Sequence, residues 1–215
     1  GMKEFSDMYM TYSSIEEFDP MIKKGLRRVA LVGTPCQIKS VRRMQALGVV
    51  PSDSVQFCLG LFCSGNFVFG EQERMHLAQT GGFNWDEVSK INIKEHLMVH
   101  LKTGEIKTVE LDDLESIRRH ACRFCPDYSA EYADVSFGGI GAREGWTTVI
   151  TRTPLGRAAL ADAKTAGAIE HYRYQDDPTY ASAALGKVQE WSARKKMRAE
   201  KFRNQLGPRS VRIKE

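Results

Sequence analysis

A C-x-x-C pair followed directly by proline, at Cys122, Cys125 and Pro126, is the feature that most restricts how this chain can fold. Two further cysteines, Cys36 and Cys63, each stand at the end of an apolar run upstream. A cubane iron–sulfur cluster needs four thiolate ligands, and a C-x-x-C turn supplies two of them from one short loop. The other two must come from elsewhere. We therefore predict a fold that brings these four cysteines together around one cluster.

Two other kinds of site fit the same cysteines and stay open at this point. A structural zinc site also uses C-x-x-C pairs, and the chain would then be a zinc-stabilised interaction module. A thiol-dependent redox or acyl-transfer enzyme would need only Cys36 as its nucleophile. For Cys36, the ordinary alternative is a small, buried, apolar side chain.

The composition is that of a globular protein with reduced cysteines. The chain has 215 residues, a net charge of +4 and five cysteines. An odd and modest number of cysteines argues against a secreted disulfide scaffold, so we expect a cytoplasmic protein. The apolar runs are too short to span a membrane. The small positive charge is compatible with an anionic ligand, and no nucleic-acid-binding motif is present, so we expect no nucleic acid partner.

Residues 28–33 and 34–47 predict a strand, a tight turn and a helix, the beginning of a βαβ unit. The strand is short, rich in β-branched residues and closed by glycine. Thr34 is placed to cap the helix, Pro35 occupies its first position, and Gly48 ends it. This arrangement puts Cys36 at a helix N-terminus, where unpaired N–H groups and the helix dipole stabilise a thiolate.

A second apolar strand is predicted over residues 54–63. In α/β sheets, ligands collect at the carboxyl ends of the strands. Cys36 follows the end of the first strand and Cys63 closes the second, so we expect both at one edge of the sheet. Cys58 lies in the middle of the second strand, on the opposite face from Cys63, and is predicted to be a core residue.

The rest of the chain completes the prediction of an α/β fold: a mixed sheet with a βαβ start, an antiparallel meander in the middle and a long C-terminal helix. Alternating apolar residues over 87–111 predict the meander. Other predicted helices cover 15–24, 67–79 (capped by Asn66), 112–120, 155–166 and 177–204, and other strands 135–138, 145–153 and 169–174. We divide the chain into an N-terminal lead-in segment over 1–27, an α/β core over 28–176 and a basic helix with a tail over 177–215.

Four motifs in order, Val32–Gln37, Gly60–Cys63, Cys122–Asp134 and Gly145–Ile150, resemble the C-terminal region of the coenzyme F420 hydrogenase/dehydrogenase beta-subunit family. The resemblance covers nearly the whole chain. It implies an oxidoreductase subunit with an FAD, a 4Fe-4S cluster and a site for the deazaflavin coenzyme F420, the substrate. Its partners would be other subunits of a hydrogenase or dehydrogenase complex, as in archaeal methanogenesis.

The resemblance also implies roles for particular residues. The cluster ligands would be Cys36, Cys63, Cys122 and Cys125. The flavin would lie against a glycine loop, with two threonines and an arginine as phosphate or ring contacts: Gly138, Gly139, Gly141, Thr147, Thr148 and Arg152. Glycine amides and a guanidinium both suit a pyrophosphate, although a G-G-x-G pattern alone is more often only a loop. We expect no catalytic side chain, because the cofactors carry the chemistry.

The beginning of the chain qualifies this expectation. Family members have a further N-terminal region before the strand that ends at Gly33, whereas only about thirty residues precede that strand here. We therefore expect either a fragment or a naturally short member, and if that region supplies part of the flavin pocket, we expect this chain alone to bind FAD poorly.

The helix over 177–204 carries many basic residues, which we interpret as a face exposed to solvent. The alternatives are a helix that docks against a partner, or a basic rim that binds an anionic coenzyme.

Overall fold

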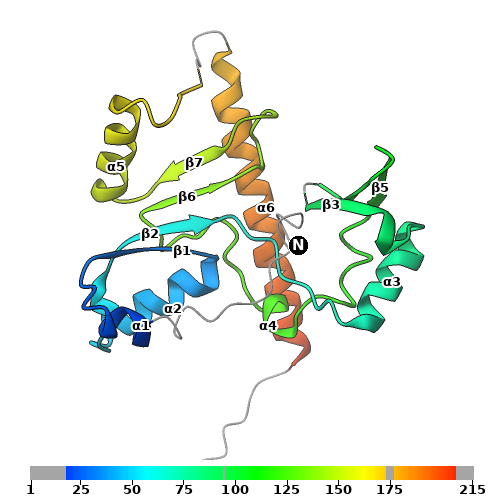
Figure 1. The fold of residues 1–215 in the computed structure, drawn as a ribbon, viewed down its shortest axis with the longest axis horizontal. Coiled ribbons are helices and arrows are strands. Elements are labelled where there is room, and N and C mark those ends of the chain that lie inside the picture. Colours follow the sequence, from blue (N-terminus) through cyan, green and yellow to red (C-terminus); the bar gives the residue numbers. More distant parts are fainter. Residues whose placement is uncertain (1–17, 94, 173–176, 207–215) are drawn as a thin grey trace, which may run out of the picture. The chain divides into compact units, whose positions relative to one another are not determined.

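The computed structural model describes residues 18–93, 95–172 and 177–206, and these form two compact units (Figure 1). One unit, here called the meander unit, comprises Gly65–Arg123. The other, the sheet unit, joins the described parts of Ser13–Ser64 and Phe124–Glu215. The predicted boundaries between the lead-in segment, core and basic helix remain predictions.

A four-stranded sheet with the order β1-β2-β6-β7 forms the centre of the sheet unit. Strands β1 (Val29–Gly33), β2 (Val55–Leu61) and β6 (Val135–Gly138) run parallel, and β7 (Thr148–Thr151) runs antiparallel to β6. The sheet is therefore mixed, and the α/β prediction with a βαβ start is confirmed. Strand β7 closes the sheet as an edge strand.

Helix α2 (Pro35–Ala46) connects β1 to β2, where the sequence predicts it. The side-chain oxygen of Gln37 accepts hydrogen bonds from the Thr34 backbone N–H at 2.9 Å and from the Thr34 hydroxyl at 3.0 Å, which fixes the first turn. Ile38 and Val41 are fully buried on the inner face of α2, against Cys58 of β2. Cys58 has no exposed surface, so its prediction as a core residue is confirmed.

The remaining helices of the sheet unit are α1 (Phe18–Lys23), a 3-10 turn at Ser52–Ser54, α5 (Pro154–Thr165) and α6 (Pro178–Gln205). The start of the predicted helix over 15–24 lies outside the described residues. Figure 1 shows α1 and α2 beside β1 and β2, and α5 beside β7. The predicted strand over 169–174 is wrong for residues 169–172, which form no strand, and its remainder is not described. Tyr172 instead packs its ring against Trp146 and Tyr180.

The predicted meander is confirmed, as a separate three-stranded antiparallel sheet in the meander unit. It consists of β3 (Val88–Ile93), β4 (Leu97–Leu101) and β5 (Ile106–Val109), preceded by a 3-10 turn at Trp85–Glu87. Ile91, Leu97 and Val99 are fully buried and pack together with Leu77 of α3 (Glu71–Gly81). One face of the alternating pattern thus forms the core of this unit.

Two helix predictions in the meander unit need correction. Helix α3 begins at Glu71 after Gly70, and not after Asn66. Residues 66–68 are extended, because Phe67 forms a β-bridge with Arg118 and the Val68 N–H donates to the Ile117 carbonyl at 2.7 Å. The predicted helix over 112–120 is a series of tight turns, followed by the short helix α4 (His120–Arg123). These turns bury Leu114 and Ile117.

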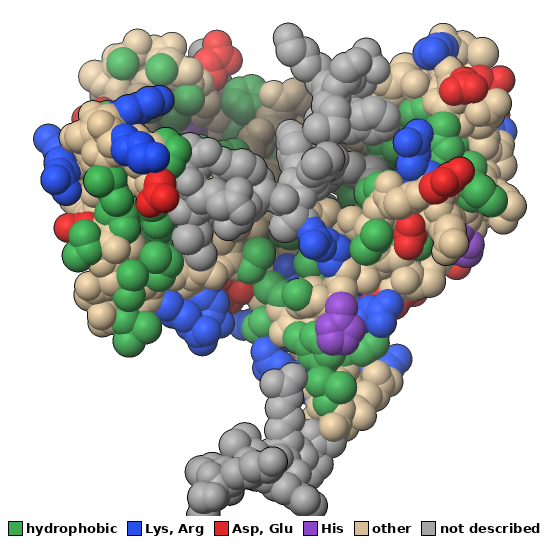
Figure 2. All heavy atoms as spheres, turned by 60° about the horizontal axis from the view of Figure 1, so that its bottom comes forward, with side chains coloured by type: hydrophobic (Ala, Val, Ile, Leu, Met, Phe, Trp, Pro, Cys, Tyr) green, Lys and Arg blue, Asp and Glu red, His purple; other side chains and the backbone are tan. Residues whose placement is uncertain are grey.

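The apolar character of the helices and the distribution of charge on the surface are relevant to binding at membranes and to polyanions. No helix within the described ranges combines the length and apolar character needed to cross a membrane. On the face drawn in Figure 2, the Lys and Arg side chains are scattered among hydrophobic and polar ones.

Candidate functional site

Two of the predicted ligands, Cys36 and Cys63, lie beyond the same edge of the four-stranded sheet. Each follows a glycine of its strand by the same number of residues. Strands β1 and β2 pair in parallel, with Gly33 opposite Gly60. Cys36 and Cys63 each stand three positions beyond these paired glycines. Parallel strands present their carboxyl ends at one edge, so both cysteines lie beyond the edge where α/β sheets bind ligands. The sequence predicts this placement correctly.

Cys36 occupies the first turn of α2 and is exposed. Its Sγ lies 3.2 Å from the Thr34 hydroxyl, which is close enough for a hydrogen bond. The N-terminal end of a helix carries unpaired N–H groups and partial positive charge. This is the helix position that the sequence predicts for Cys36.

Cys63 is tied to the loop that follows the C-x-x-C pair. Its backbone N–H donates to the Tyr128 carbonyl at 2.8 Å, and the rings of Phe62 and Tyr128 lie 5.7 Å apart. Burial and, as a smaller effect, the negative charge of Cys63 raise the pKa of the Tyr128 phenol, which therefore stays neutral. Cys125 lies three residues before Tyr128, with its Sγ 3.7 Å from the Asp127 carbonyl. The loops carrying Cys63 and Cys125 are thus joined within the sheet unit.

Helix α6 holds both of these loops through three cations, here called the α6 cations: Lys195, Arg198 and Arg203. Lys195 donates to the Cys63 carbonyl at 2.5 Å, Arg198 to the Ser64 carbonyl at 2.6 Å and Arg203 to the Phe124 carbonyl at 3.1 Å. The Lys195 residue is only 3% exposed. Part of the basic face predicted to be solvated therefore faces inward and binds the backbone beside two cysteines.

Sequence reasoning missed this role, although the sequence holds a signal for it. Trp191, Lys195, Arg198 and Phe202 follow one another at spacings of four, three and four residues, which places them on one face of a helix. Trp191 packs against Tyr128 and Phe202 against Phe124. Two aromatic residues in the same stripe as two cations indicate a face that packs against the protein.

Cys122 lies in the meander unit, within the short helix α4. The backbone N–H of Asn66 donates to its Sγ at 3.3 Å. The four predicted ligands are therefore divided between the units, three in the sheet unit and one in the meander unit. Over residues 18–93, 95–172 and 177–206, no group of three or more Cys, His, Asp and Glu side chains is arranged to hold a metal ion. The donor chemistry and the strand-end positions suit a thiolate-ligated cluster, and the cluster itself remains a prediction.

The core cysteine has different chemistry from the other four. Cys58 is fully buried, and its backbone N–H donates to the Asp134 carboxylate at 2.8 Å. Burial raises the pKa of the Cys58 thiol, a shift that Arg42 opposes and Asp134 reinforces. Its thiol therefore stays protonated in the folded protein above the usual pKa of 9.0. This keeps Cys58 out of thiolate chemistry.

This shift predicts a dependence of stability on alkaline pH. The folded state retains the Cys58 proton at a pH where the unfolded chain releases it, so the stabilisation is complete below about pH 9 and is lost as the pH rises. The free energy of unfolding of the parent is expected to fall more steeply above pH 9 than that of Cys58→Ala, by up to about 1.4 kcal/mol per pH unit. Urea denaturation from pH 7 to 11 measures this slope. Parallel slopes for the two proteins would contradict it.

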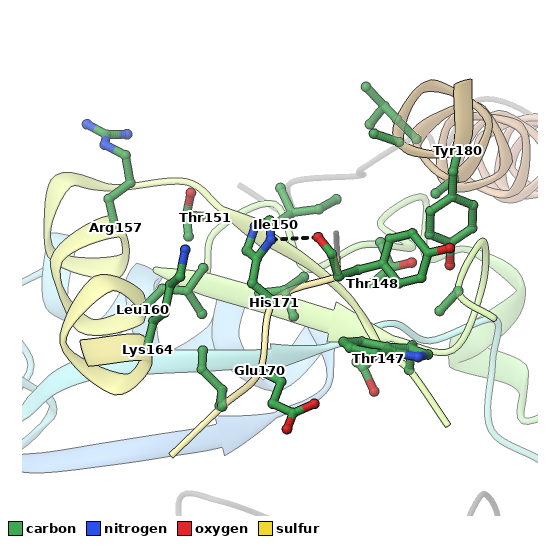
Figure 3. Close-up of a pocket in the computed structure, with 18 of the residues that line it drawn as sticks. Thr147, Thr148, Ile150, Thr151, Arg157, Leu160, Lys164, Glu170, His171 and Tyr180 are labelled. Atoms are coloured by element: carbon green, nitrogen blue, oxygen red, sulfur yellow. Dashed lines mark hydrogen bonds between the residues drawn. The ribbon is translucent and has the colours of Figure 1, made fainter. Parts of the chain in front are cut away.

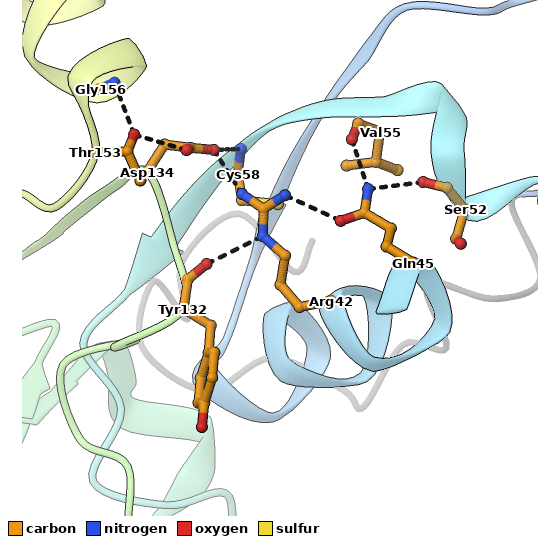
Figure 4. Close-up of polar contacts among 9 residues, drawn as sticks. All are labelled: Arg42, Gln45, Ser52, Val55, Cys58, Tyr132, Asp134, Thr153 and Gly156. Carbon is orange, nitrogen blue, oxygen red and sulfur yellow. Dashed lines mark hydrogen bonds and ion pairs between the residues drawn. The ribbon is translucent and has the colours of Figure 1, made fainter. Parts of the chain in front are cut away.

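Asp134, the last residue of the motif that begins at Cys122, is the centre of a buried polar network (Figure 4). Its carboxylate accepts hydrogen bonds at 2.8 Å from three groups, namely the Arg42 guanidinium, the Cys58 backbone N–H and the Thr153 hydroxyl. The Thr153 hydroxyl in turn accepts from the Gly156 N–H at 3.0 Å. One carboxylate thus connects α2, β2 and the start of α5. Sequence analysis assigned Asp134 no role of its own.

A pocket of about 410 Å³ lies between β7, α5, the segment over 169–172 and the first turns of α6 (Figure 3). Of the predicted flavin contacts, Thr147 and Thr148 line this pocket. The Thr148 hydroxyl donates to the Ile140 carbonyl at 2.7 Å, which holds the start of β7 against the glycine loop. The pocket also contains residues that sequence analysis did not select, namely Trp146, Arg157, Lys164, Glu170, His171, Tyr172 and Tyr180.

The other predicted flavin contacts do not line this pocket. Arg152 donates from its guanidinium to the carbonyl and hydroxyl of Ser129 and to the Ser136 hydroxyl, so it connects β7 to the interior. A side chain at Gly138 would overlap the ring of Phe62, with a closest approach of 2.5 Å, and one at Gly141 would come within 2.6 Å of the α6 backbone. Gly139 has open space beside it. The glycines therefore permit close packing, and their contact with a ligand remains a prediction.

Comparisons with known proteins identify relatives of this chain. The family model that describes the C-terminal region of the beta subunit of coenzyme F420 hydrogenase/dehydrogenase matches residues 26–177. The beta subunit of coenzyme F420 hydrogenase from Methanococcus voltae is 33% identical over 186 residues, which cover 85% of this chain and 64% of the relative. The same subunit from Methanothermobacter thermautotrophicus is 31% identical, covering 84% and 66%.

A solved structure agrees with these matches. A chain of the F420-reducing [NiFe] hydrogenase complex from Methanosarcina barkeri superposes with a TM-score of 0.78 at 25% identity, covering 92% of this chain and 68% of the other. In the sequence comparisons with the Methanococcus and Methanothermobacter subunits, the matched segment covers 64% and 66% of the relative. This chain therefore spans slightly less than two thirds of the length of these two subunits. The matched segment contains the strand-end cysteines, the C-x-x-C pair and most of the pocket.

Proposed function

Because this chain belongs to the coenzyme F420 hydrogenase/dehydrogenase beta-subunit family, we propose that it is an F420-linked oxidoreductase subunit that transfers electrons to or from the deazaflavin. The observation that carries the proposal is the family match over residues 26–177, which contains all four predicted cluster ligands. Relatives include a protein named coenzyme F420-dependent sulfite reductase, from Methanocaldococcus jannaschii, 32% identical over 146 residues. The shared element of these names is the coenzyme, so F420 is the proposed substrate.

A 4Fe-4S cluster held by Cys36, Cys63, Cys122 and Cys125 is the proposed electron relay. Three observations support it. Cys36 and Cys63 follow the ends of paired strands, Cys36 lies in the first turn of helix α2, and buried Lys195 places positive charge beside Cys63. A cluster with four thiolates is anionic, so nearby cations favour its binding. When bound, the cluster would supply one-electron transfer, while the chain fixes the positions of the thiolates.

FAD is the second proposed cofactor, and it would supply the step between one-electron and hydride chemistry. Thr147 and Thr148 are the proposed side-chain contacts, because they line the pocket beside β7. Gly138, Gly139 and Gly141 would bring the backbone close to the flavin, and Arg152 would keep β7 in place through Ser129 and Ser136. The chain would exclude water and orient the ring, with no side chain acting as an acid or base. The proposed setting is a cytoplasmic complex with further hydrogenase or dehydrogenase subunits.

Anaerobic purification with iron, sulfide, zinc and flavin analysis tests this proposal. We expect near-equal amounts of iron and sulfide, released flavin, and reduction of F420 followed by its visible absorbance when an artificial electron donor is supplied. Stoichiometric zinc without sulfide would instead favour the interaction module. A metal-free protein that stays metal-free after anaerobic reconstitution, with Cys36 alkylated selectively, would favour thiol chemistry.

A further inference from the structure

Lys195 is the only buried member of the α6 cations. The residue is 3% exposed, whereas Arg198 is half-buried and Arg203 is exposed. Its ammonium group donates to the Cys63 carbonyl at 2.5 Å, and within the described part of the chain it forms no ion pair. Burying an ammonium group costs free energy that a hydrogen bond to a neutral carbonyl offsets only in part. A cation kept in the interior without a carboxylate partner therefore indicates an electrostatic role.

The position of this charge is fixed by the packing of α6. Val188, Trp191, Lys195 and Ala199 follow one another at spacings of three, four and four residues, and all four are buried along one face of the helix. The ring of Trp191 lies 5.9 Å from that of Tyr128, whose backbone carbonyl accepts from the Cys63 N–H at 2.8 Å. The contacts that hold the Cys63 backbone therefore also hold the helix that carries Lys195.

The charge of Lys195 also acts on the loop that contains Cys125. Asp127, two residues after Cys125, is 6% exposed, and its carboxylate accepts from the Glu131 backbone N–H at 3.1 and 3.2 Å. Burial raises the pKa of the Asp127 carboxyl, and the positive charge of Lys195 is among the influences that oppose this rise. The field of one ammonium group thus reaches the loops of two predicted cluster ligands.

From these contacts we infer that Lys195 raises the reduction potential of the proposed 4Fe-4S cluster, by holding a positive charge beside the loops that carry Cys63 and Cys125. Reduction brings one electron from the donor and adds one negative charge, and no bond forms or breaks. A fixed cation nearby stabilises the more negative, reduced form above the oxidised form, and net charge is one of the factors that set cluster potentials. The inference rests on the proposed function and deepens it. Lys195 contacts no substrate in this assignment and acts through its charge alone.

A redox titration of the whole 215-residue chain tests this role. The anaerobically reconstituted protein is titrated with sodium dithionite, and the reduced fraction is followed by visible absorbance and electron paramagnetic resonance. Lys195→Gln removes the charge and keeps an N–H donor for the Cys63 carbonyl. We expect its one-electron equilibrium to shift about tenfold toward the oxidised form, a potential lower by about 59 mV. A unit charge about 10 Å from a redox centre, at an effective dielectric constant of about 20, has an effect of this size.

Three further variants separate charge from packing. Lys195→Met is a second neutral variant, apolar and of similar length, and its potential should fall in the same way. Lys195→Arg keeps the charge and should retain the parent potential. Lys196→Gln is the matched control, because it removes the same charge from the next residue, whose side chain is 53% exposed and pairs with Glu131 at 3.5 Å. Solvent and the paired carboxylate screen that charge, so the potential should stay unchanged.

Several outcomes would overturn the role assigned to Lys195. These are equal potentials in the parent and the two neutral variants, equal shifts in Lys195→Gln and Lys196→Gln, or the loss of iron from Lys195→Gln at an unchanged circular dichroism spectrum. The last result would make Lys195 a support for cluster assembly instead. Iron, sulfide and F420 reduction are measured on the same samples. A full cluster whose potential does not respond to Lys195 leaves the proposed function standing, whereas a parent chain without a cluster after reconstitution contradicts both.

Discussion

Asp134→Ala is expected to lower the free energy of unfolding by about 3–5 kcal/mol, the usual cost of removing one partner from a buried ion pair. The Asp134 side chain is 6% exposed, and it accepts bonds from Arg42, the Cys58 N–H and Thr153. The variant would leave these donors without their acceptor in the interior, where an unsatisfied group costs more than a bond contributes. Urea or guanidinium denaturation, monitored by circular dichroism, measures the change.

Matched variants distinguish the stability contributed by this network from the effect of removing any carboxylate. Asp162→Ala removes an exposed carboxylate from α5 and is expected to change stability by less than about 0.5 kcal/mol. Arg42→Ala should have a smaller effect than Asp134→Ala, about 1.5–3 kcal/mol, since the Arg42 side chain is 28% exposed. If Asp134→Ala and Asp162→Ala prove equally stable, the carboxylate is not the centre of this network.

Replacing any one of Cys36, Cys63, Cys122 and Cys125 with serine is expected to remove most of the bound iron and sulfide from the anaerobically purified protein. A serine hydroxyl is a far weaker ligand than a thiolate for iron in a cluster, so the loss of one ligand destabilises the whole group. The measurement is the iron and sulfide content per chain, together with the visible absorbance of the cluster.

The fifth cysteine supplies the matched control for this series. Cys58→Ala removes a thiol from the interior of β2 and should keep the full iron content, because Cys58 is a core residue that stays protonated. A serine variant that retains all of its iron would remove that residue from the ligand set. Iron loss in Cys58→Ala with an unchanged fold would overturn the separation between the core cysteine and the other four.

Local signals in the sequence were sufficient for the part of the fold that positions Cys36 and Cys63. The strand ending at Gly33, the Thr34 cap and Pro35 at the first helical position are contained in a few consecutive residues, and each favours the same structure. The alternation that predicts β3, β4 and β5 is equally local. Such elements can be identified without knowing what they pack against.

The wrong prediction at Asn66 and the contacts that sequence analysis missed both involve residues far apart in the chain. Asn66 has the chemistry of a helix cap, yet Phe67 pairs with Arg118, about fifty positions later, and this keeps the segment extended. The Asp134 network joins residues 76 positions apart, and the bond from Lys195 to the Cys63 carbonyl joins residues 132 positions apart. A single sequence without an alignment does not reveal such pairs, because neither residue carries a local signal of its partner.

The α6 cations have a consequence for the order of events during synthesis. Cys63 and Phe124 emerge from the ribosome well before their partners Lys195 and Arg203, which lie 132 and 79 positions later in the chain. Domains form as their chains are completed, and contacts across long separations form late. The hydrogen bonds from α6 to the loops that carry the cysteines therefore form only after α6 has left the ribosomal exit tunnel. A cofactor loaded onto these loops before α6 emerges would meet them without these hydrogen bonds, and a chain truncated before Lys195 would present the cysteines without the backbone support that holds them.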